Sequence, residues 1–108
     1  MGKFELYTDA AGEYRFRLKA GNGQNILASE GYTTKAACEN GIDSVRLNSQ
    51  IPERFEITES ASGKYHFNLK AANHQIIGSS QMYATHEAAT HGAQSVALNA
   101  PEAEVEEV

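Results

Sequence analysis

A row of basic residues alternates with apolar ones in a short segment, and this row could bind an anion. Arg15, Arg17 and Lys19 occupy every second position of residues 14–19, and Lys70 stands at the position of Lys19 in a second, similar segment. Every second side chain of a strand lies on the same face, so these four residues would line one face of a sheet. A cationic face with an aromatic ring nearby can bind single-stranded nucleic acid through its phosphates and bases.

Acidic residues beside this basic row favour a different interpretation. Glu5 and Glu56 occupy outward positions of the adjacent predicted strands, where cross-strand ion pairs would neutralise the cations. The second copy of the row is also weaker, because it reads His66, Asn68, Lys70. The net charge of −5 weighs against a polyanionic partner, since Lys and Arg drive phosphate binding. We therefore favour a solvated, ion-paired face and keep weak nucleic-acid binding as the alternative.

The four histidines all lie in the second half of the chain, which raises the question of a metal site. His86 and His91 are five residues apart and would diverge around a helix, whereas a spacing of three or four would converge. No Glu-x-x-His or cysteine motif accompanies them. We expect surface histidines, which include His66 and His74, and no metal or other cofactor.

The repeated serines do not form a predicted catalytic set. Ser29 recurs as Ser80 and Ser44 as Ser95, but neither pair has a repeated histidine that could act as its base. We expect these hydroxyls to satisfy local backbone groups. The chain is therefore predicted not to be an enzyme; a hydrolase or transferase would need a concave pocket with at least two titratable groups.

All these residues are positioned by an internal repeat. Residues 4–49 recur at 55–100, and 21 of the 46 aligned positions are identical. A unit of this size is too small to bury a core alone, so neither copy is expected to fold by itself. We predict a single domain over residues 1–108, in which two repeats share one core. The acidic tail 101–108 is predicted to add a last strand, with a frayed end as the alternative.

Each repeat is predicted to form three strands and a helix. Alternating apolar and polar residues predict the strands, and Thr34 and Thr85 are the predicted helix N-caps. A glycine in the middle of each helix, Gly41 and Gly92, indicates a close approach to the sheet or to the other helix. The turn at Asn73-His74 is expected to differ from that at Asn22-Gly23, because His adopts positive φ less readily. The predicted strands are residues 4–8, 14–19, 24–29, 55–58, 65–70 and 75–80.

Several segments together resemble the YegP-like family of small bacterial proteins, in its tandem-repeat form. They are the strand Tyr-Arg-Phe-Arg-Leu-Lys, residues 20–24 (Ala-Gly-Asn-Gly-Gln), residues 29–35 and residues 39–45. The resemblance covers nearly the whole chain. It implies an α+β fold in which two β-β-β-α repeats share one antiparallel sheet, with two helices on one face and pseudo-two-fold symmetry. It also implies that single-repeat members form dimers that exchange a C-terminal strand.

The resemblance implies no activity, ligand or catalytic residue, so the functional hypothesis depends on the residues themselves. The second repeat departs from the family pattern at His74, Gly78 and Met82. Cys38, the only cysteine, aligns with Ala89 and is expected to be a small buried hydrophobe. We predict a small, monomeric, cytoplasmic domain without a membrane segment. The sequence does not identify its role or its partner. The hypothesis is a non-catalytic binding or protein-interaction module, with a sheet edge or the groove between the helices as its contact surface.

Overall fold

The computed structural model describes residues 2–108, and in it each repeat folds into three strands and a helix. Their bounds lie close to the predicted ones. The first repeat comprises β1 (Lys3–Thr8), β2 (Tyr14–Lys19), β3 (Asn25–Ala28) and α1 (Lys35–Asn48). The second comprises β4 (Phe55–Glu59), β5 (Tyr65–Lys70), β6 (Ile76–Ser79) and α2 (His86–Asn99). Short 3-10 helices, Pro52–Arg54 and Ala100–Glu102, follow α1 and α2, and the second leads into β7 (Glu104–Glu107).

Local sequence accounts for where these elements begin and which face they bury. The Thr34 hydroxyl accepts a hydrogen bond from Ala37 N at 3.1 Å, and Thr85 caps α2 in the same way, so both predicted N-caps are confirmed. In β2, Phe16 and Leu18 are fully buried, whereas the intervening basic residues lie on the other face. The period of two therefore separates the core from the charged face.

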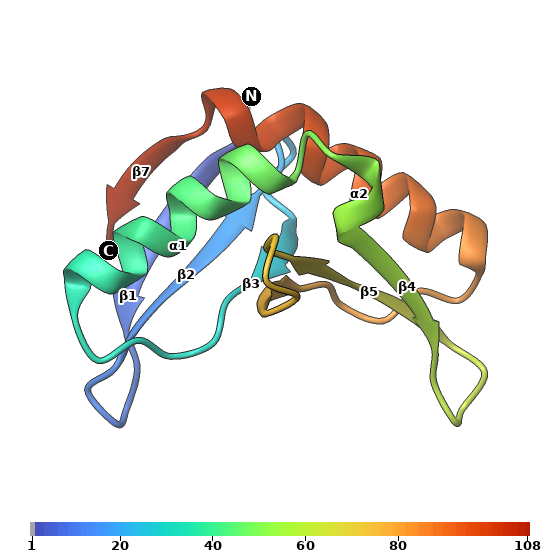
Figure 1. Cartoon of the computed structure of the whole chain (residues 1–108), viewed down its shortest axis with the longest axis horizontal. Helices are drawn as coiled ribbons and strands as arrows, with labels where there is room; N and C mark the ends of the chain where they lie inside the picture. The colour runs from blue at the N-terminus through green and yellow to red at the C-terminus, as the bar shows by residue number, and fades with distance from the viewer. Residues whose placement is uncertain (1) are drawn as a thin grey trace.

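The seven strands form one sheet in the order β4-β5-β6-β3-β2-β1-β7, with both helices on one face (Figure 1). The two repeats meet where β3 pairs with β6, through Ala28 and Ser79, and this junction marks the pseudo-two-fold axis. The predicted α+β fold is confirmed. The tail does form a strand, but β7 runs parallel to β1, so the sheet is mixed rather than antiparallel throughout.

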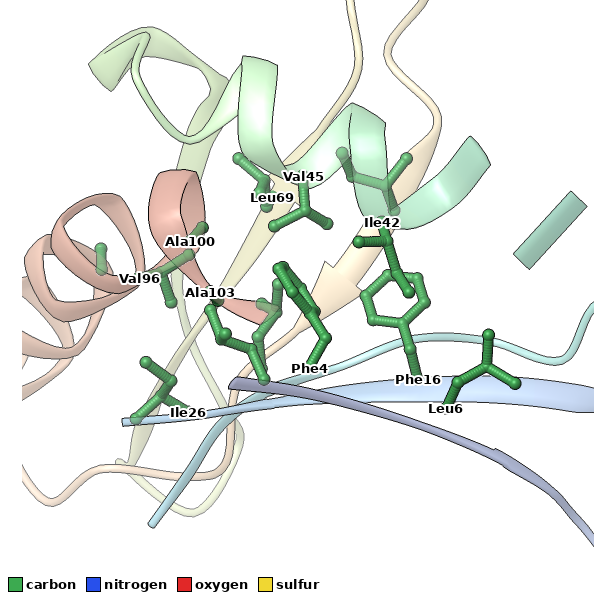
Figure 2. Packing of buried hydrophobic residues seen from close by; sticks show 14 of the residues in the cluster. Phe4, Leu6, Phe16, Ile26, Ile42, Val45, Leu69, Val96, Ala100 and Ala103 are labelled. Atoms are coloured by element: carbon green, nitrogen blue, oxygen red, sulfur yellow. The ribbon is translucent and has the colours of Figure 1, made fainter. Parts of the chain in front are cut away.

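The hydrophobic core draws on both repeats. Phe4, Phe16, Ile42 and Val45 of the first repeat belong to the same buried cluster as Leu69, Val96 and Ala100 of the second (Figure 2). Each helix also crosses the junction, since α1 contacts β5 and β6 while α2 contacts β3. Neither half therefore encloses its apolar residues without the other.

At the junction itself the two repeats differ in a complementary way. Leu27 of β3 is 2 % exposed, and the aligned residue in β6 is Gly78. A Cβ atom added at Gly78 would lie 2.7 Å from Leu27 Cγ. The glycine thus leaves the space that the leucine fills across the pseudo-two-fold axis.

The turn at Asn73-His74 keeps the conformation of its counterpart, so the expected difference is wrong. Gly23 has φ 85° and His74 has φ 69°. Each donates its amide to the residue three positions earlier at 2.9 Å. The surrounding hairpin therefore holds His74 in a left-handed conformation that suits glycine better.

The helix glycines make the predicted close approach, and the contact is with the sheet side. A Cβ atom at Gly41 would lie 2.5 Å from the Tyr32 hydroxyl oxygen and 3.1 Å from Phe16 Cε2. Gly92 is packed in the same way against Tyr83 and Phe67. Neither helix in the described chain is long and apolar enough to cross a membrane.

Candidate functional site

The basic row lies on the sheet face opposite the helices, and its cations are paired with carboxylates. Arg17 Nε donates to Glu5 Oε1 at 2.6 Å, and Lys19 Nζ lies 3.3 Å from the same oxygen. Lys70 Nζ lies 3.1 Å from Glu56 Oε1. The hydrogen bond from Arg17 lowers the pKa of Glu5 below its ordinary value, although burial opposes the shift. Neutralisation by Glu5 and Glu56, anticipated from the sequence, is therefore present.

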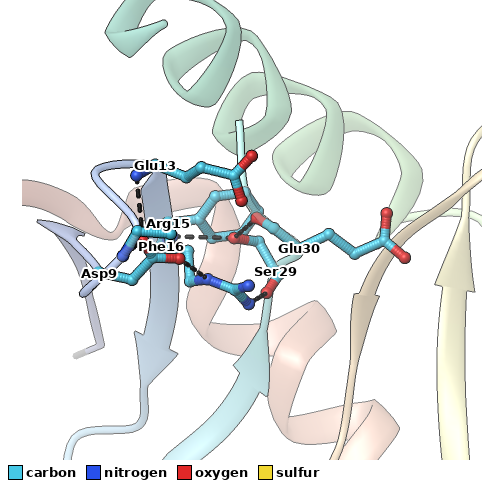
Figure 3. Close-up of polar contacts among 7 residues, drawn as sticks. Asp9, Glu13, Arg15, Phe16, Ser29 and Glu30 are labelled. Carbon is cyan, nitrogen blue, oxygen red and sulfur yellow. Dashed lines mark hydrogen bonds and ion pairs between the residues drawn. The ribbon is translucent and has the colours of Figure 1, made fainter. Parts of the chain in front are cut away.

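Arg15 is held at the other end of the row (Figure 3). Its Nε donates to Asp9 Oδ2 at 2.7 Å, and its Nη1 donates to the Ser29 backbone oxygen at 3.4 Å. Asp9 also accepts from two backbone amides of its own turn. The Arg15 hydrogen bond is the largest cause that lowers the pKa of Asp9. The guanidinium is thus part of a structural turn.

The histidines do not converge. No group of three or more His, Cys, Asp or Glu side chains that could hold a metal ion occurs within residues 2–108. His86 packs edge-on against the Tyr65 ring, with the ring centroids 5.7 Å apart, whereas His66 lies half-buried in β5. His74 occupies the strained turn and His91 is exposed on α2.

The repeated serines have structural contacts. Ser29 Oγ accepts from Phe16 N at 2.9 Å and donates to Glu30 O at 2.8 Å. Ser80 repeats both contacts, so this pair satisfies backbone groups as predicted. Ser44 Oγ instead accepts from the Asn48 side chain at 3.1 Å, and Ser95 accepts from Asn99 in the same way.

Cys38 lies in the core and Tyr32 packs against it, so neither stands at a reactive site. Cys38 is fully buried, as expected of a residue aligned with alanine. Burial raises the pKa of its thiol to about 11, so the nucleophilic thiolate is suppressed. Tyr32 stacks on Phe16 with the ring centroids 6.3 Å apart, and burial raises the pKa of its hydroxyl.

The two ends of the sheet differ in a way that identifies a candidate binding surface. At one end β7 covers β1, with Val105 beside Phe4 in the parallel register. Val108 N donates to Leu6 O at 2.9 Å. As a result Phe4 and Leu6 are 0 % and 1 % exposed.

Charged side chains hold β7 in this place. They come from the start of β1 and from the exposed side of α1, and they reach acidic side chains or a backbone oxygen of the C-terminal segment. Ion pairs and hydrogen bonds of this kind fix the orientation of a strand as well as its position. The contacts are Lys3 Nζ to Glu106 Oε1 at 3.4 Å, Lys35 Nζ to Glu107 Oε1 at 2.6 Å and Arg46 Nη2 to Ala103 O at 2.6 Å.

At the other end β4 is the last strand of the sheet, and a groove opens beside it. Phe55 and Ile57 align with Phe4 and Leu6, yet both are only partly buried. The groove has a volume of about 370 Å³. It is lined by Ser49, Gln50 and Pro52 after α1, by Phe55 and Ile57 of β4, and by Thr90, Ala93, Gln94 and Ala97 of α2. We call it the β4 groove.

A second groove, of about 380 Å³, lies between α1 and β7. It contains titratable groups, Glu39, Asp43 and Arg46, but the Arg46 guanidinium donates to Asp43 at 3.1 Å and to the Ala103 backbone oxygen. The Asp43 side chain is 72 % exposed. Arg46 is therefore held by Asp43 and by the C-terminal segment, and the Asp43 carboxylate is solvated.

The expected contact surface was a sheet edge or the groove between the helices, and the β4 groove adjoins a sheet edge. It separates α2 from the edge strand β4. Sequence reasoning missed it because the groove exists only where no strand lies outside β4, at the α2 end of the sheet. The signal was present in the tail, since residues 101–108 extend the chain past the second helix and cover only one of two equivalent edges.

Two stretches of the chain, residues 9–56 and 60–107, match the domain family described as "Domain of unknown function (DUF1508)". Each stretch ends in the strand that follows a helix, β4 or β7. The chain is 53 % identical over 107 residues to the "UPF0339 protein in ptx operon 5'region" of Stutzerimonas stutzeri, which covers 99 % of this chain and 96 % of that protein. It is 56 % identical over 98 residues to the "UPF0339 protein YegP" of Escherichia coli (strain K12), covering 91 % and 89 % of the two chains.

Two solution NMR structures have the same fold. The structure of YegP from Escherichia coli superimposes with a TM-score of 0.93 at 53 % identity, covering 98 % of this chain and 91 % of that one. The structure of a UPF0339 protein from Shewanella oneidensis superimposes with a TM-score of 0.92 at 45 % identity, covering 98 % and 90 %. The YegP structure is described as that of a protein of unknown function.

Proposed function

This chain belongs to the DUF1508 family, whose domain has no established function, and we propose that it is a non-catalytic protein-interaction module. Its contact surface is the open edge of β4 together with the β4 groove. One observation carries the proposal. The position outside β1 in the sheet is occupied by β7, whereas none of residues 2–108 pairs with the equivalent outer edge of β4.

The physical basis is that a sheet edge presents unpaired backbone N–H and C=O groups. Such an edge pairs readily with an extended segment of another chain, and addition of a strand is a common mode of protein recognition. At β4 the edge is combined with the partly buried apolar side chains of Phe55 and Ile57. Backbone pairing would supply affinity, and the groove would select the side chains.

The chemistry of the groove favours binding over catalysis. Its nine lining residues include no Asp, Glu, His, Cys, Lys or Arg. The groove therefore has no general acid or base, and Ser49 and Thr90 have no group there that would activate them as nucleophiles. Nucleic-acid binding is disfavoured because Arg15, Arg17, Lys19 and Lys70 are already paired with carboxylates. A cation in an ion pair has less to gain from a phosphate.

We further propose that the chain works as a monomer in the bacterial cytoplasm. The relatives reported above come from bacteria. The single cysteine is buried and forms no disulfide, which suits a reducing compartment. The partner would then be another cytoplasmic protein.

Site-specific photo-crosslinking in bacterial cells tests the proposal. A photoreactive amino acid at Gln94, which lines the groove, is expected to give an adduct of discrete mass with another protein. The same amino acid at His91, an exposed position one turn earlier on α2, is the matched control and is expected to give none. Adducts at neither position, or equal adducts at both, would remove the β4 edge as the contact surface.

A further inference from the structure

We infer that the segment bound at β4 is an extended strand of another protein, parallel to β4, with two apolar side chains in the β4 groove and a basic side chain beside Glu56. This inference rests on the proposed function and adds the chemistry of the partner. The internal repeat supplies a template for this strand. In the first repeat, β7 pairs with β1 and shows how an added strand lies beside the edge strand of a repeat.

The direction follows from that template. β7 runs parallel to β1, and the outward backbone oxygen of Leu6 accepts the amide of Val108. Ile57 aligns with Leu6, and its backbone groups point to the same, open side because alternate residues of a strand share an orientation. The pseudo-two-fold axis relates the two edges. A strand bound at β4 would therefore begin beside Pro52 and run parallel to β4 toward Glu59.

The β4 groove would accommodate larger apolar side chains of a bound strand than those that β7 places beside β1. Beside β1, Val105 pairs with Phe4 in the register and lines the same groove as Ile42 and Arg46. In the β4 groove the aligned helix residues are alanines, Ala93 and Ala97. The smaller residues leave apolar volume that Leu or Ile would fill better than Val. Filling such volume is favourable because buried apolar area is removed from water.

The two edges of the sheet also differ in the charges on the face opposite the helices. Glu5 is surrounded by Arg17, Lys19 and Lys3, and Lys3 also reaches Glu106 of β7. The Glu5 side chain is consequently only 8 % exposed. These three cations offset the negative charge of Glu5, so the acidic strand β7 can lie beside β1.

Glu56 has a different environment. Its side chain is 57 % exposed and pairs with Lys70 alone, because Asn68 stands where Arg17 stands in the first repeat. Asn68 is bonded instead to the Ser79 hydroxyl at 2.7 Å. An outward residue beside Glu56 is therefore favoured when it is basic and disfavoured when it is acidic.

A second copy of this chain does not fit these requirements. Its only comparable strand, β7, carries Glu104, Glu106 and Glu107. Two of the three cations that hold β7 beside β1 have no counterpart beside β4, where His86 replaces Lys35 and Ala97 replaces Arg46. Arg54 stands at the position of Lys3 and donates to Asn48 Oδ1 at 2.6 Å. Transfer of β7 to another copy would lose the contacts that Lys35 and Arg46 make with it, so a foreign strand is the better occupant.

Two peptide probes that differ at one residue test the inference. Both have the sequence of residues 100–108 with Val105→Leu and Glu107→Ile, and only one also carries Glu106→Lys. Fluorescence anisotropy with the intact protein is expected to show about five- to tenfold tighter binding of the lysine probe. In the Glu56→Gln protein the two probes are expected to bind within about twofold of each other, because the charge they distinguish is gone.

Protein variants locate the site and protect the test against misfolding. Gln94→Trp places an indole in the groove from an exposed position and is expected to weaken both probes about tenfold or more. His91→Trp is the matched control and is expected to bind like the parent. Thermal melting checks that both variants are folded. A spin label on the probe N-terminus should broaden amide signals near Arg54 if the strand is parallel, and near Glu59 if it is antiparallel.

The outcomes separate this inference from the proposed function. Equal binding of the two probes, or a preference for the glutamate probe, would overturn the basic partner and leave the groove as a contact surface. Broadening near Glu59 would overturn the direction. Absence of binding by either probe at millimolar concentration, or no effect of Gln94→Trp, would overturn strand addition itself. A concentration-dependent dimer abolished by Gln94→Trp would identify a second copy as the occupant and contradict the inference.

Discussion

At the scale of single residues, Glu5 and Glu56 are identical in type and in repeat position but differ in environment. Glu5 accepts a hydrogen bond from Arg17 and lies near two lysines, with its side chain 8 % exposed, whereas Glu56 has one exposed ion pair. Hydrogen bonds to charged, buried groups stabilise a fold by about 1.5–3 kcal/mol, and exposed pairs by less than about 1 kcal/mol. Glu5→Gln is therefore expected to lower the free energy of unfolding more than Glu56→Gln, as chemical denaturation at pH 7 would show.

The pH dependence of stability gives an independent check on Glu5. Its pKa in the folded chain lies below the ordinary value of 4.5. The stabilisation is thus complete above pH 4.5 and is lost as the pH falls through the folded pKa. Glu5→Gln should flatten this acid decline, and Glu56→Gln should leave it nearly unchanged. An acid decline equal in the parent and in Glu5→Gln would contradict the role of this carboxylate.

His74 carries a second prediction at the residue scale. It adopts φ 69° in a turn where the first repeat has Gly23 at φ 85°. A side chain in the left-handed region costs about 1 kcal/mol, so His74→Gly is expected to raise the melting temperature. The inverse change, Gly23→His, should lower it by a similar amount. Unchanged melting of both variants would mean that the turn carries no strain.

At the scale of elements, the contact between each helix and the sheet depends on a glycine and a tyrosine. Gly41→Ala removes a helix-propensity penalty of about 1 kcal/mol, but its Cβ would meet the Tyr32 hydroxyl at 2.5 Å. Overpacking costs about 1–3 kcal/mol, so the net effect is expected to be destabilising. Tyr32→Phe in the same chain should recover part of the loss, since Cζ would remain at 2.9 Å.

Thermal denaturation measures this effect, with Asn40→Ala as the control. Asn40 is an exposed neighbour on the same helix, where alanine is expected to be neutral or slightly stabilising. If Gly41→Ala stabilised the chain as much as Asn40→Ala does, the close approach inferred for Gly41 would be wrong.

Local signals predicted the elements well but not their arrangement at the edges. Alternation predicted β2 and β5, the threonine caps predicted the helix starts, and Gly41 predicted a close contact, because each depends on residues near in sequence. The direction of β7 and the opening beside β4 depend on contacts between residues about a hundred positions apart. The ion pairs of Glu5 could be anticipated only because consecutive antiparallel strands bring their outward residues together.

At the scale of the whole molecule, the two repeats are similar but not interchangeable at their junction. Leu27 fills the space that Gly78 leaves. Leu27→Gly should destabilise by creating a cavity, and Gly78→Leu by overpacking. The double variant restores one leucine and one glycine across the axis and is expected to be more stable than the sum of the two single changes by about 1 kcal/mol or more. Strict additivity in equilibrium unfolding would contradict a shared junction.

The central claim is that one edge of the sheet is covered and its equivalent is open, and amide hydrogen exchange tests it most directly. Leu6 and Ile57 occupy aligned positions of β1 and β4, and only Leu6 has a strand, β7, on its outer side. The Leu6 amide is predicted to be strongly protected and the Ile57 amide to exchange much faster under the same conditions. Equal protection of the two amides would contradict the open edge and, with it, the binding surface proposed for this chain.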